Sequence, residues 1–189
     1  MSVSVVLWVC AAVVVFWALG AYNRLVRVRA ELSQSLLAIT TQWNNTAQTL
    51  RNTLQEFSAE PVRESQWDNL DNGQTPWRSL SLAAKQLQAC LGLVMARSHA
   101  LPPVDDLASL HAARQLLESA WRQLKDQHED LAGAVVPPQL ILLWQQHAQQ
   151  SDEKLKAYNS QAQAYNQAIA QFPALLLAWI FSFHSTVNL

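Results

Sequence analysis

Apolar residues at the start of the chain form one unbroken block. It covers residues 3–21, reads VSVVLWVCAAVVVFWALGA and contains no charged side chain. About 20 helical residues cover about 30 Å, the thickness of the hydrocarbon core of a bilayer. Ten residues of the block are Val, Leu or Phe, which favours insertion by roughly 3 to 6 kcal/mol. The pattern predicts a transmembrane anchor over residues 1–21.

A cleaved signal peptide is the alternative interpretation of this block, because Ala18-Leu19-Gly20 resembles a small-residue cleavage site. Residues 1–6 lack the basic side chains that open such peptides, whereas Arg24, Arg27 and Arg29 follow the block. We therefore favour an uncleaved anchor. Because positive charge is retained on the cytoplasmic side, the arginines predict an outside N-terminus and a cytoplasmic domain. Beside an anionic leaflet each arginine contributes about 1 kcal/mol of attraction.

Beyond Gly20, apolar side chains recur every three or four residues, which is the spacing of one helical face. This first stripe consists of Leu25, Val28, Leu32, Leu36, Ile39, Trp43, Ala47, Leu50, Leu54 and Phe57. Residues 58–75 have no sustained period and contain Pro61 and an Asp-Asn-Gly turn signal. The pattern predicts one helix from the anchor to Ser58, followed by a loop.

Proline and glycine mark the ends of three further predicted helices. The second begins at Pro76 with Thr75 as its N-cap, the third follows Pro102-Pro103 and closes at Gly133, and the fourth opens at Pro137-Pro138. Their apolar stripes contain Leu80, Ala84, Leu87, Leu91 and Val94; Leu107, Leu110, Leu117, Trp121, Leu124 and Leu131; and Leu140, Trp144, His147, Leu155, Tyr158, Ala162, Tyr165, Ile169 and Phe172. Short connections between these helices imply antiparallel neighbours. We expect an all-α fold in which residues 22–171 form an antiparallel four-helix bundle of long helices.

The last segment, residues 172–189, begins with twelve uncharged residues, FPALLLAWIFSF. At about 18 Å as a helix this stretch is too short to span a bilayer, and Pro173 suits the start of a new element. We expect it to lie in the membrane interface, with Trp179 and His184 at headgroup level. The alternative is that it packs over the open end of the bundle.

Composition excludes several classes of function. The chain has 189 residues, four glycines and a formal net charge of −1, so no global positive field exists to recruit nucleic acid. Cys10 and Cys90 make neither a disulfide framework nor a metal set.

Motifs for catalysis are absent from the sequence, which contains no nucleophile elbow and no glycine-rich phosphate loop. Its five histidines show neither an i, i+4 pair nor a Glu-x-x-His motif. His128 and His147 occupy seam positions on adjacent helices, where Glu118 or Glu129 could join them; core or boundary positions are the simpler interpretation. We expect no enzymatic activity, no cofactor and no metal.

The triplet Ala-Tyr-Asn occurs three times, at residues 21–23, 157–159 and 164–166. The helix lengths place Tyr22-Asn23 and Tyr165-Asn166 at the same, membrane-proximal end of the bundle. Tyrosine there combines an apolar body with a hydroxyl group, and asparagine can fix register across helices. The simpler interpretation makes Tyr158 and Tyr165 core residues, with Asn159 and Asn166 on a solvated flank.

These motifs carry a family resemblance. The apolar anchor running into YNRLVRVR at residues 22–29, together with AYNSQAQAYNQAIAQFPALLLAWIFSF before the C-terminus, resembles the LemA family of bacterial membrane proteins. The resemblance implies an N-terminal transmembrane helix, a compact bundle of long antiparallel helices and no established enzymatic activity. The family-motif residues are Tyr22, Asn23, Tyr158, Asn159, Tyr165, Asn166, Phe172 and Pro173.

The chain departs from the family pattern between these motifs. Residues 49–58, TLRNTLQEFS, replace an Asp-Leu-Ile-Pro-Asn-Leu stretch, and residues 134–140, AVVPPQL, replace a Tyr-Pro-x-Leu-Lys motif. Ala148 and Leu155 stand where an acidic residue and an arginine are usual. The chain therefore resembles a divergent member, and functions that depend on the middle of the family pattern are not carried over.

Two functional hypotheses follow. The first is a single-pass, membrane-anchored structural or interaction module whose partners are the lipid bilayer and a protein, a second copy of the chain included; its membrane-proximal residues are Arg24, Arg27, Arg29, Phe172, Trp179 and Phe183. The second is a ligand-sensing or metal-binding bundle with a pocket between helices lined by Trp43, Trp121 and Trp144.

Overall fold

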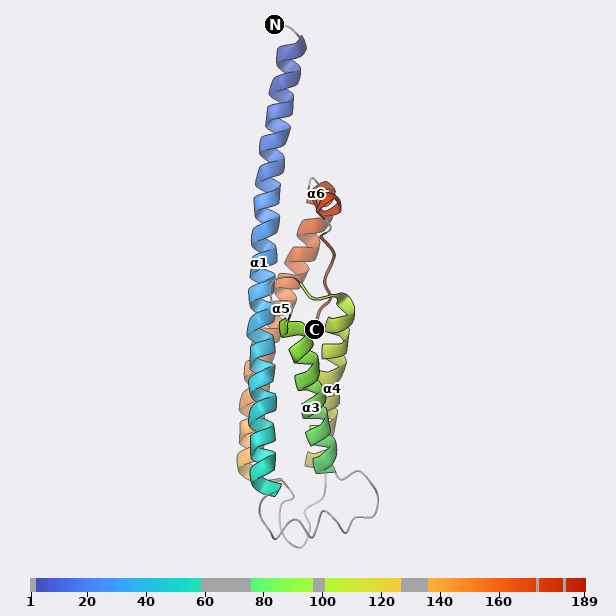
Figure 1. The fold of residues 1–189 in the computed structure, drawn as a ribbon. Helices are drawn as coiled ribbons and strands as arrows, with labels where there is room; N and C mark the ends of the chain where they lie inside the picture. Colours follow the sequence, from blue (N-terminus) through green and yellow to red (C-terminus); the bar gives the residue numbers. More distant parts are fainter. Residues whose placement is uncertain (1–2, 59–75, 97–100, 127–135, 173, 182) are drawn as a thin grey trace. The chain divides into compact units, whose positions relative to one another are not determined.

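The computed structural model of the chain describes residues 3–58, 76–96, 101–126, 136–172, 174–181 and 183–189. Every regular element in these ranges is a helix, so the predicted all-α class is confirmed (Figure 1). The helices are α1 (Val3–Ser58), α3 (Pro76–Ala96), α4 (Val104–Lys125), α5 (Pro138–Ala170) and α6 (Ala174–Ile180).

The chain divides into two compact units. Unit 1 contains Met1–Leu36 and Lys156–Asn188, and unit 2 contains Leu37–Leu155 together with Leu189. The long helices α1 and α5 each contribute one part to either unit.

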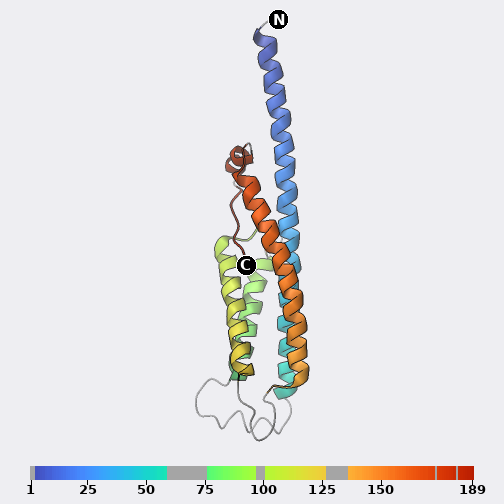
Figure 2. The same cartoon turned by 180° about the vertical axis from the view of Figure 1, so that it is seen from behind.

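Unit 1 is built from the first half of α1, the end of α5, α6 and the residues that follow α6. The predicted stripe is buried on both long helices, at Leu25, Leu32 and Leu36 of α1 and at Tyr158, Ala162, Tyr165 and Ile169 of α5. In the two opposite views the N-terminal part of α1 continues well past α6 (Figures 1 and 2). This part of the helix therefore has no helical neighbour within the described part of unit 1.

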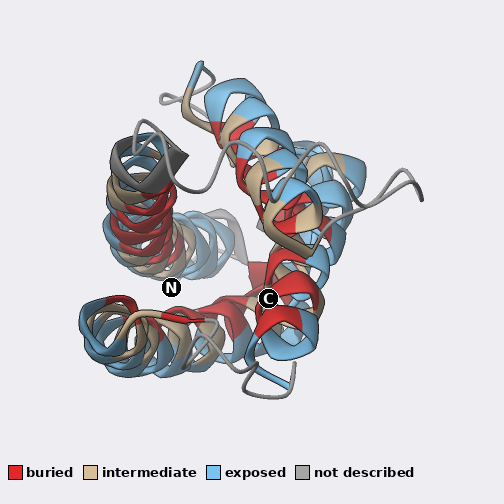
Figure 3. Ribbon diagram, turned by 90° about the horizontal axis from the view of Figure 1, so that it is seen from below, coloured by how far each residue is buried: buried red, intermediate tan, exposed pale blue. Residues whose placement is uncertain are grey.

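The described residues of unit 2 include four helical segments that meet in pairs. Trp121 of α4 stacks on Trp144 of α5, and α3 packs against α4. On the other side, Arg51 of α1 donates to Gln88 of α3 at 2.6 Å, and Gln42 of α1 donates to Gln150 of α5 at 2.9 Å. Figure 3 shows the buried positions along the inward faces of the helices. Each of these segments thus contacts two others.

Helix α4 shows how charge and proline set the ends of an element. Pro103 precedes its first turn and its carbonyl accepts from the backbone N–H groups of Asp106 and Leu107. Asp105 and Asp106 lie in the first turn, and Arg122 and Lys125 in the last, as the helix dipole favours. The helix ends at Lys125, before the predicted closure at Gly133; residues 127–135, which include Gly133 and Leu131, lie outside the described residues.

Two described helices, α1 and α3, are long and apolar enough to cross a membrane. They differ in burial. None of the most apolar window of α1 is buried, whereas 33% of that of α3 is. The buried face of α3 contains Leu80, Ala83, Ala84, Leu87, Leu91 and Val94, which is typical of a core helix.

Candidate functional site

Burial on α6 is the reverse of that on an ordinary surface helix. Its two alanines, Ala174 and Ala178, face inward and are buried. The large apolar side chains of α6 whose burial the structure describes point outward; Trp179 is 83% exposed and Ile180 is 61% exposed, and Leu175 and Leu176 are exposed as well. A helix in water normally buries its large apolar residues and exposes small or polar ones. The outward face of α6 therefore matches an apolar surrounding.

The end of α5 and the residues around α6 lie beside α1, in agreement with the predicted position of Tyr22-Asn23 and Tyr165-Asn166 at the same end. The rings of Trp17 and Phe172 are 5.4 Å apart, and those of Tyr22 and Phe181 are 5.1 Å apart. Phe172 remains 70% exposed. Apolar side chains of α1 before these contacts are exposed too, namely Val5, Val6, Leu7, Trp8, Val9, Val13, Val14, Val15, Phe16, Trp17 and Leu19. Exposed apolar side chains thus occur on both α1 and α6 of unit 1.

The three arginines after the apolar block have different surroundings. Arg29 is half-buried, with its guanidinium 5.1 Å from the centroid of the Phe183 ring. Arg27 is exposed and lies 3.9 Å from Glu31. Arg24 is exposed and lines a groove next to Phe172. Only Arg29 is thus used to hold the C-terminal segment, by a cation–π contact.

The second and third Ala-Tyr-Asn triplets hold the end of the chain. Tyr158 is fully buried, and its hydroxyl donates to the carbonyl of Val187 at 3.1 Å and lies 3.3 Å from the hydroxyl of Thr186. Burial raises the pKa of Tyr158, against the opposing effect of the Thr186 bond, so the hydroxyl keeps its proton. Asn166 donates its Nδ2 to the carbonyl of Thr186 at 2.8 Å and accepts from the Thr186 amide at 3.0 Å. We call this set of bonds from Tyr158 and Asn166 to residues 186–187 the tail clamp.

Part of the simpler interpretation of the triplets was wrong. Tyr158 and Tyr165 are core residues as it proposes, and burial raises the pKa of Tyr165 as well. Asn166 is not on a solvated flank, because both ends of its amide are bonded to Thr186. Asn159 is half-buried and Asn23 is exposed. The sequence analysis missed Thr186. The one sequence feature that points to such a partner is that polar groups on a buried helix face, such as the Tyr158 hydroxyl, need hydrogen-bond partners.

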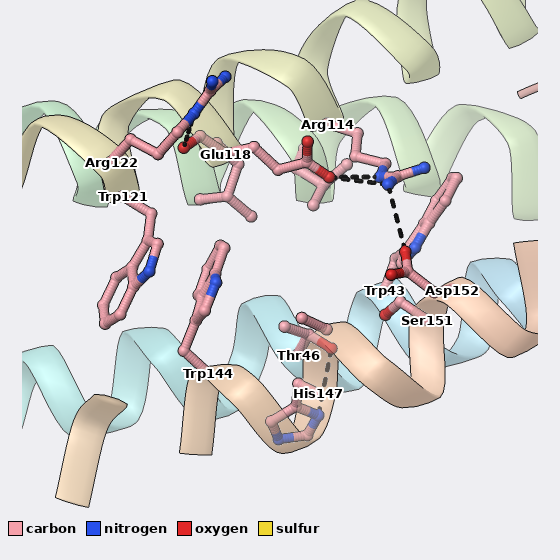
Figure 4. Close-up of a pocket in the computed structure, with 13 residues that line it drawn as sticks. Trp43, Thr46, Arg114, Glu118, Trp121, Arg122, Trp144, His147, Ser151 and Asp152 are labelled. Atoms are coloured by element: carbon pink, nitrogen blue, oxygen red, sulfur yellow. Dashed lines mark hydrogen bonds and ion pairs between the residues drawn. The ribbon is translucent and has the colours of Figure 1, made fainter. Parts of the chain in front are cut away.

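The three tryptophans of the ligand-binding hypothesis line one pocket in unit 2. It has a volume of about 340 Å³, and Trp43, Trp121 and Trp144 are among its walls (Figure 4). The rings of Trp121 and Trp144 are stacked with centroids 4.6 Å apart and an interplanar angle of 13°. The indole Nε1 of Trp43 is buried and has no hydrogen-bond partner among the described residues.

Arg114 is a half-buried cation in the wall of this pocket. Its guanidinium lies 5.3 Å from the centroid of the Trp43 ring, 2.8 Å from the Glu118 carboxylate and 3.8 Å from Asp152 (Figure 4). Two carboxylates therefore already surround the cation, and its aromatic contact is occupied. The pocket therefore presents apolar walls to a ligand, whereas the charge of Arg114 is already paired.

A network of polar side chains joins α1 to α5 beside the pocket. His147 Nδ1 lies 3.3 Å from Gln42 Nε2 and 3.3 Å from the Thr46 hydroxyl. Gln42 also donates to Gln150 at 2.9 Å and accepts from Lys154 at 3.1 Å. Because the Gln42 amide nitrogen has only hydrogens to offer, it pairs with the neutral, unprotonated Nδ1. Desolvation by burial lowers the pKa of His147, in agreement with that geometry.

Acidification is expected to destabilise the protein through His147. Its pKa is lowered in the folded state from 6.5, so below about pH 7 the unfolded chain binds more protons than the folded one. The stabilising contribution is therefore complete above the unfolded pKa and is lost as the pH falls from about 6.5 towards the folded pKa. Thermal unfolding between about pH 8 and pH 5 should show a smaller pH dependence for His147→Gln than for the unmodified chain.

The matched control for this measurement is His184→Gln, which removes an exposed imidazole. Comparing the two variants separates an effect of His147 from the loss of any one imidazole. Equal slopes for His147→Gln and the unmodified chain would contradict the assignment.

No group of three or more His, Cys, Asp or Glu side chains that could hold a metal ion occurs among the described residues. His111 hydrogen-bonds to Gln115 at 2.7 Å and His184 is exposed. His128, Glu129 and His99 lie outside the described residues, as does Pro173 of the family motif. The predicted meeting of His128 with His147 therefore remains a hypothesis.

Comparison with known proteins finds no matching protein family, no matching curated protein and no matching solved structure.

Proposed function

We propose that the chain is a single-pass membrane protein of LemA type, a non-catalytic module that binds lipid and a protein partner. The N-terminal part of α1 crosses the bilayer. Helix α6 lies in the interface of the leaflet on the side of Arg24, Arg27 and Arg29. The observation that carries the proposal is the reversed burial of α6, in which alanines face the protein while Leu175, Leu176, Trp179 and Ile180 are exposed. Full burial of each large apolar side chain in an apolar phase contributes about 1.5 to 3 kcal/mol, so α6 gains several kcal/mol from lipid.

The order of contacts along the helices supports the antiparallel four-helix bundle that belongs to this proposal. Gln42 of α1 bonds to Lys154, while Thr46 lies beside His147. Arg114 of α4 lies near Asp152, while Trp121 stacks on Trp144. In both pairs the residue number rises on one helix as it falls on the other, which is the order of antiparallel neighbours.

The distribution of charge supports an attachment to an anionic, cytoplasmic leaflet. Residues of unit 1 include four basic side chains and one acidic one, a net charge of +3, whereas unit 2 has nine basic and thirteen acidic ones, a net charge of −4. The positive residues Arg24, Arg27 and Arg29 directly follow the apolar block. Because such residues are retained on the cytoplasmic side, we propose an outside N-terminus and a cytoplasmic bundle.

Lipid contact of α6 is the expected result that tests the proposal. In the full chain, with Cys10 and Cys90 replaced by serine, Trp179→Cys carries an environment-sensitive fluorophore in vesicles that contain lipids with a quencher on the acyl chain. We expect strong quenching at position 179, because this side chain is 83% exposed on the outward face of α6.

The matched control is Leu142→Cys, which replaces another exposed apolar side chain, 66% exposed, on the part of α5 that belongs to unit 2. Its fluorophore should stay unquenched. Quenching at neither position would contradict the interfacial placement of α6. Equal quenching at both would contradict the selective contact of unit 1 with lipid.

A further inference from the structure

A groove runs along α1 in unit 1. Its walls are Val13, Trp17, Gly20 and Arg24 of α1 on one side and Phe172 and Ala174 on the other, and its volume is about 760 Å³. All of these residues belong to unit 1. Trp17 and Phe172, on its two sides, have ring centroids 5.4 Å apart.

The length of the groove corresponds to one leaflet. From Val13 to Arg24 a helix rises about 16 Å at 1.5 Å per residue, and half of a hydrocarbon core of about 30 Å is about 15 Å. At one end of the groove, the lining residues of α1 belong to the uncharged block. At the other end the lining includes Arg24, which follows that block in the sequence. The groove therefore has an apolar section of the depth of an acyl layer and a cation at headgroup depth.

Arg24 is the arginine that is free to bind a ligand. Arg27 lies beside Glu31, and Arg29 lies over the Phe183 ring. Arg24 has no ion pair or hydrogen bond within the described part of the chain. No acidic side chain occurs among the described residues that line the groove. An anion bound at Arg24 would therefore not be repelled by a carboxylate of the groove wall.

We propose that this groove holds one anionic phospholipid, with an acyl chain lying along the Trp17 and Phe172 pair and its phosphate on the Arg24 guanidinium. The inference rests on the proposed function, since it requires that α1 crosses the bilayer. It goes further by assigning a bound lipid of one charge class to a site, in place of a general contact with the membrane.

Gly20 allows the groove to be filled without a clash. A Cβ atom at this position would meet no heavy atom within 4 Å, so Gly20→Leu places its side chain in the space assigned to the acyl chain. Gly92 of α3 supplies the matched control, because a Cβ there also meets nothing within 4 Å. The control for the charge is Arg27→Gln, which removes an arginine three residues away that does not line the groove.

Native mass spectrometry of the full chain tests the proposal, with phosphatidylglycerol and phosphatidylcholine of identical acyl chains added to the protein in detergent. We expect one phosphatidylglycerol to bind about fivefold more tightly than phosphatidylcholine, since one arginine at the headgroup contributes about 1 kcal/mol. Arg24→Gln should abolish this preference, and Arg27→Gln should retain it. Gly20→Leu should reduce binding of both lipids severalfold, and Gly92→Leu should leave it unchanged.

Three outcomes would overturn the inference: equal affinity of the unmodified chain for both lipids, an equal loss of preference in Arg24→Gln and Arg27→Gln, or undiminished binding to Gly20→Leu. Carbonate extraction of membranes that contain the same variants separates this failure from failure of the proposed function. A chain that stays in the membrane pellet without a lipid preference lacks the site but keeps the anchor. A chain that is released from the pellet lacks the anchor itself.

Discussion

The full chain carrying Val9→Arg together with Ala12→Arg is expected to leave the membrane fraction. Both positions are exposed in the first part of α1, near the middle of the apolar block. An arginine at the centre of a transmembrane helix costs about 2.5 to 3.5 kcal/mol on the insertion scale, so two cost roughly 5 to 7 kcal/mol. The apolar residues of the block favour insertion by roughly 3 to 6 kcal/mol. The double substitution therefore cancels the whole driving force.

The measurement is the distribution of the chain between the pellet and the supernatant after carbonate extraction of membranes. The matched control places two arginines on α3, the second helix that is apolar enough to span, at the exposed Leu82 and Leu93. Because one face of α3 is buried within unit 2, these substitutions should leave the chain in the pellet. If the α1 variant stayed in the pellet and the α3 variant were released, α3 and not α1 would be the helix that crosses the membrane.

Replacing Tyr158 by alanine is expected to cost about 3 to 5 kcal/mol of folding free energy, the usual range for a fully buried aromatic side chain. Tyr158→Phe keeps the ring but removes the hydroxyl that donates to Val187 and lies beside Thr186. Its cost should be about 1 to 2 kcal/mol, because a buried hydrogen bond is lost and the Val187 carbonyl loses its donor. The difference between the variants separates the packing of the ring from its part in the tail clamp.

Thermal unfolding of the purified full chain, followed by circular dichroism, measures both costs. Tyr22→Ala is the control, because Tyr22 belongs to the first triplet but is only half-buried, with its ring beside Phe181. It should lower the unfolding midpoint less than Tyr158→Ala does. A Tyr158→Ala variant as stable as the unmodified chain would remove Tyr158 from the core of unit 1.

The periodic apolar positions predicted the helices well. A helix that packs by one face must have an apolar residue at every third or fourth position, so the whole face is visible in the sequence. The stripe from Leu25 to Leu54 is buried at nearly every predicted position, and α6 begins directly after Pro173, where the sequence analysis placed a new segment. Charge and apolar length also distinguished the first part of α1 from the core helices. These features depend only on the local order of residue types.

The tail clamp could not be predicted in the same way. Asn166 lies beside a buried stripe. The sequence pattern around such an asparagine is the same whether its side chain faces water or another segment of the chain. Its partner Thr186 lies 20 residues further on in a stretch without any period. The pocket is a different case, because seam positions did predict that Trp43, Trp121 and Trp144 line one pocket between helices, and all three are among its walls.

The geometry of Asn166 makes the end of the chain sensitive to slow chemical ageing. Its clamp needs both halves of a carboxamide, a nitrogen that donates to the Thr186 carbonyl and an oxygen that accepts from the Thr186 amide. Deamidation replaces that nitrogen with a second oxygen and adds a negative charge facing the carbonyl. Asparagine is among the heat-labile residues, so a stored sample that acquires an aspartate here would lose the bond to the Thr186 carbonyl and would hold residues 186–187 mainly through Tyr158.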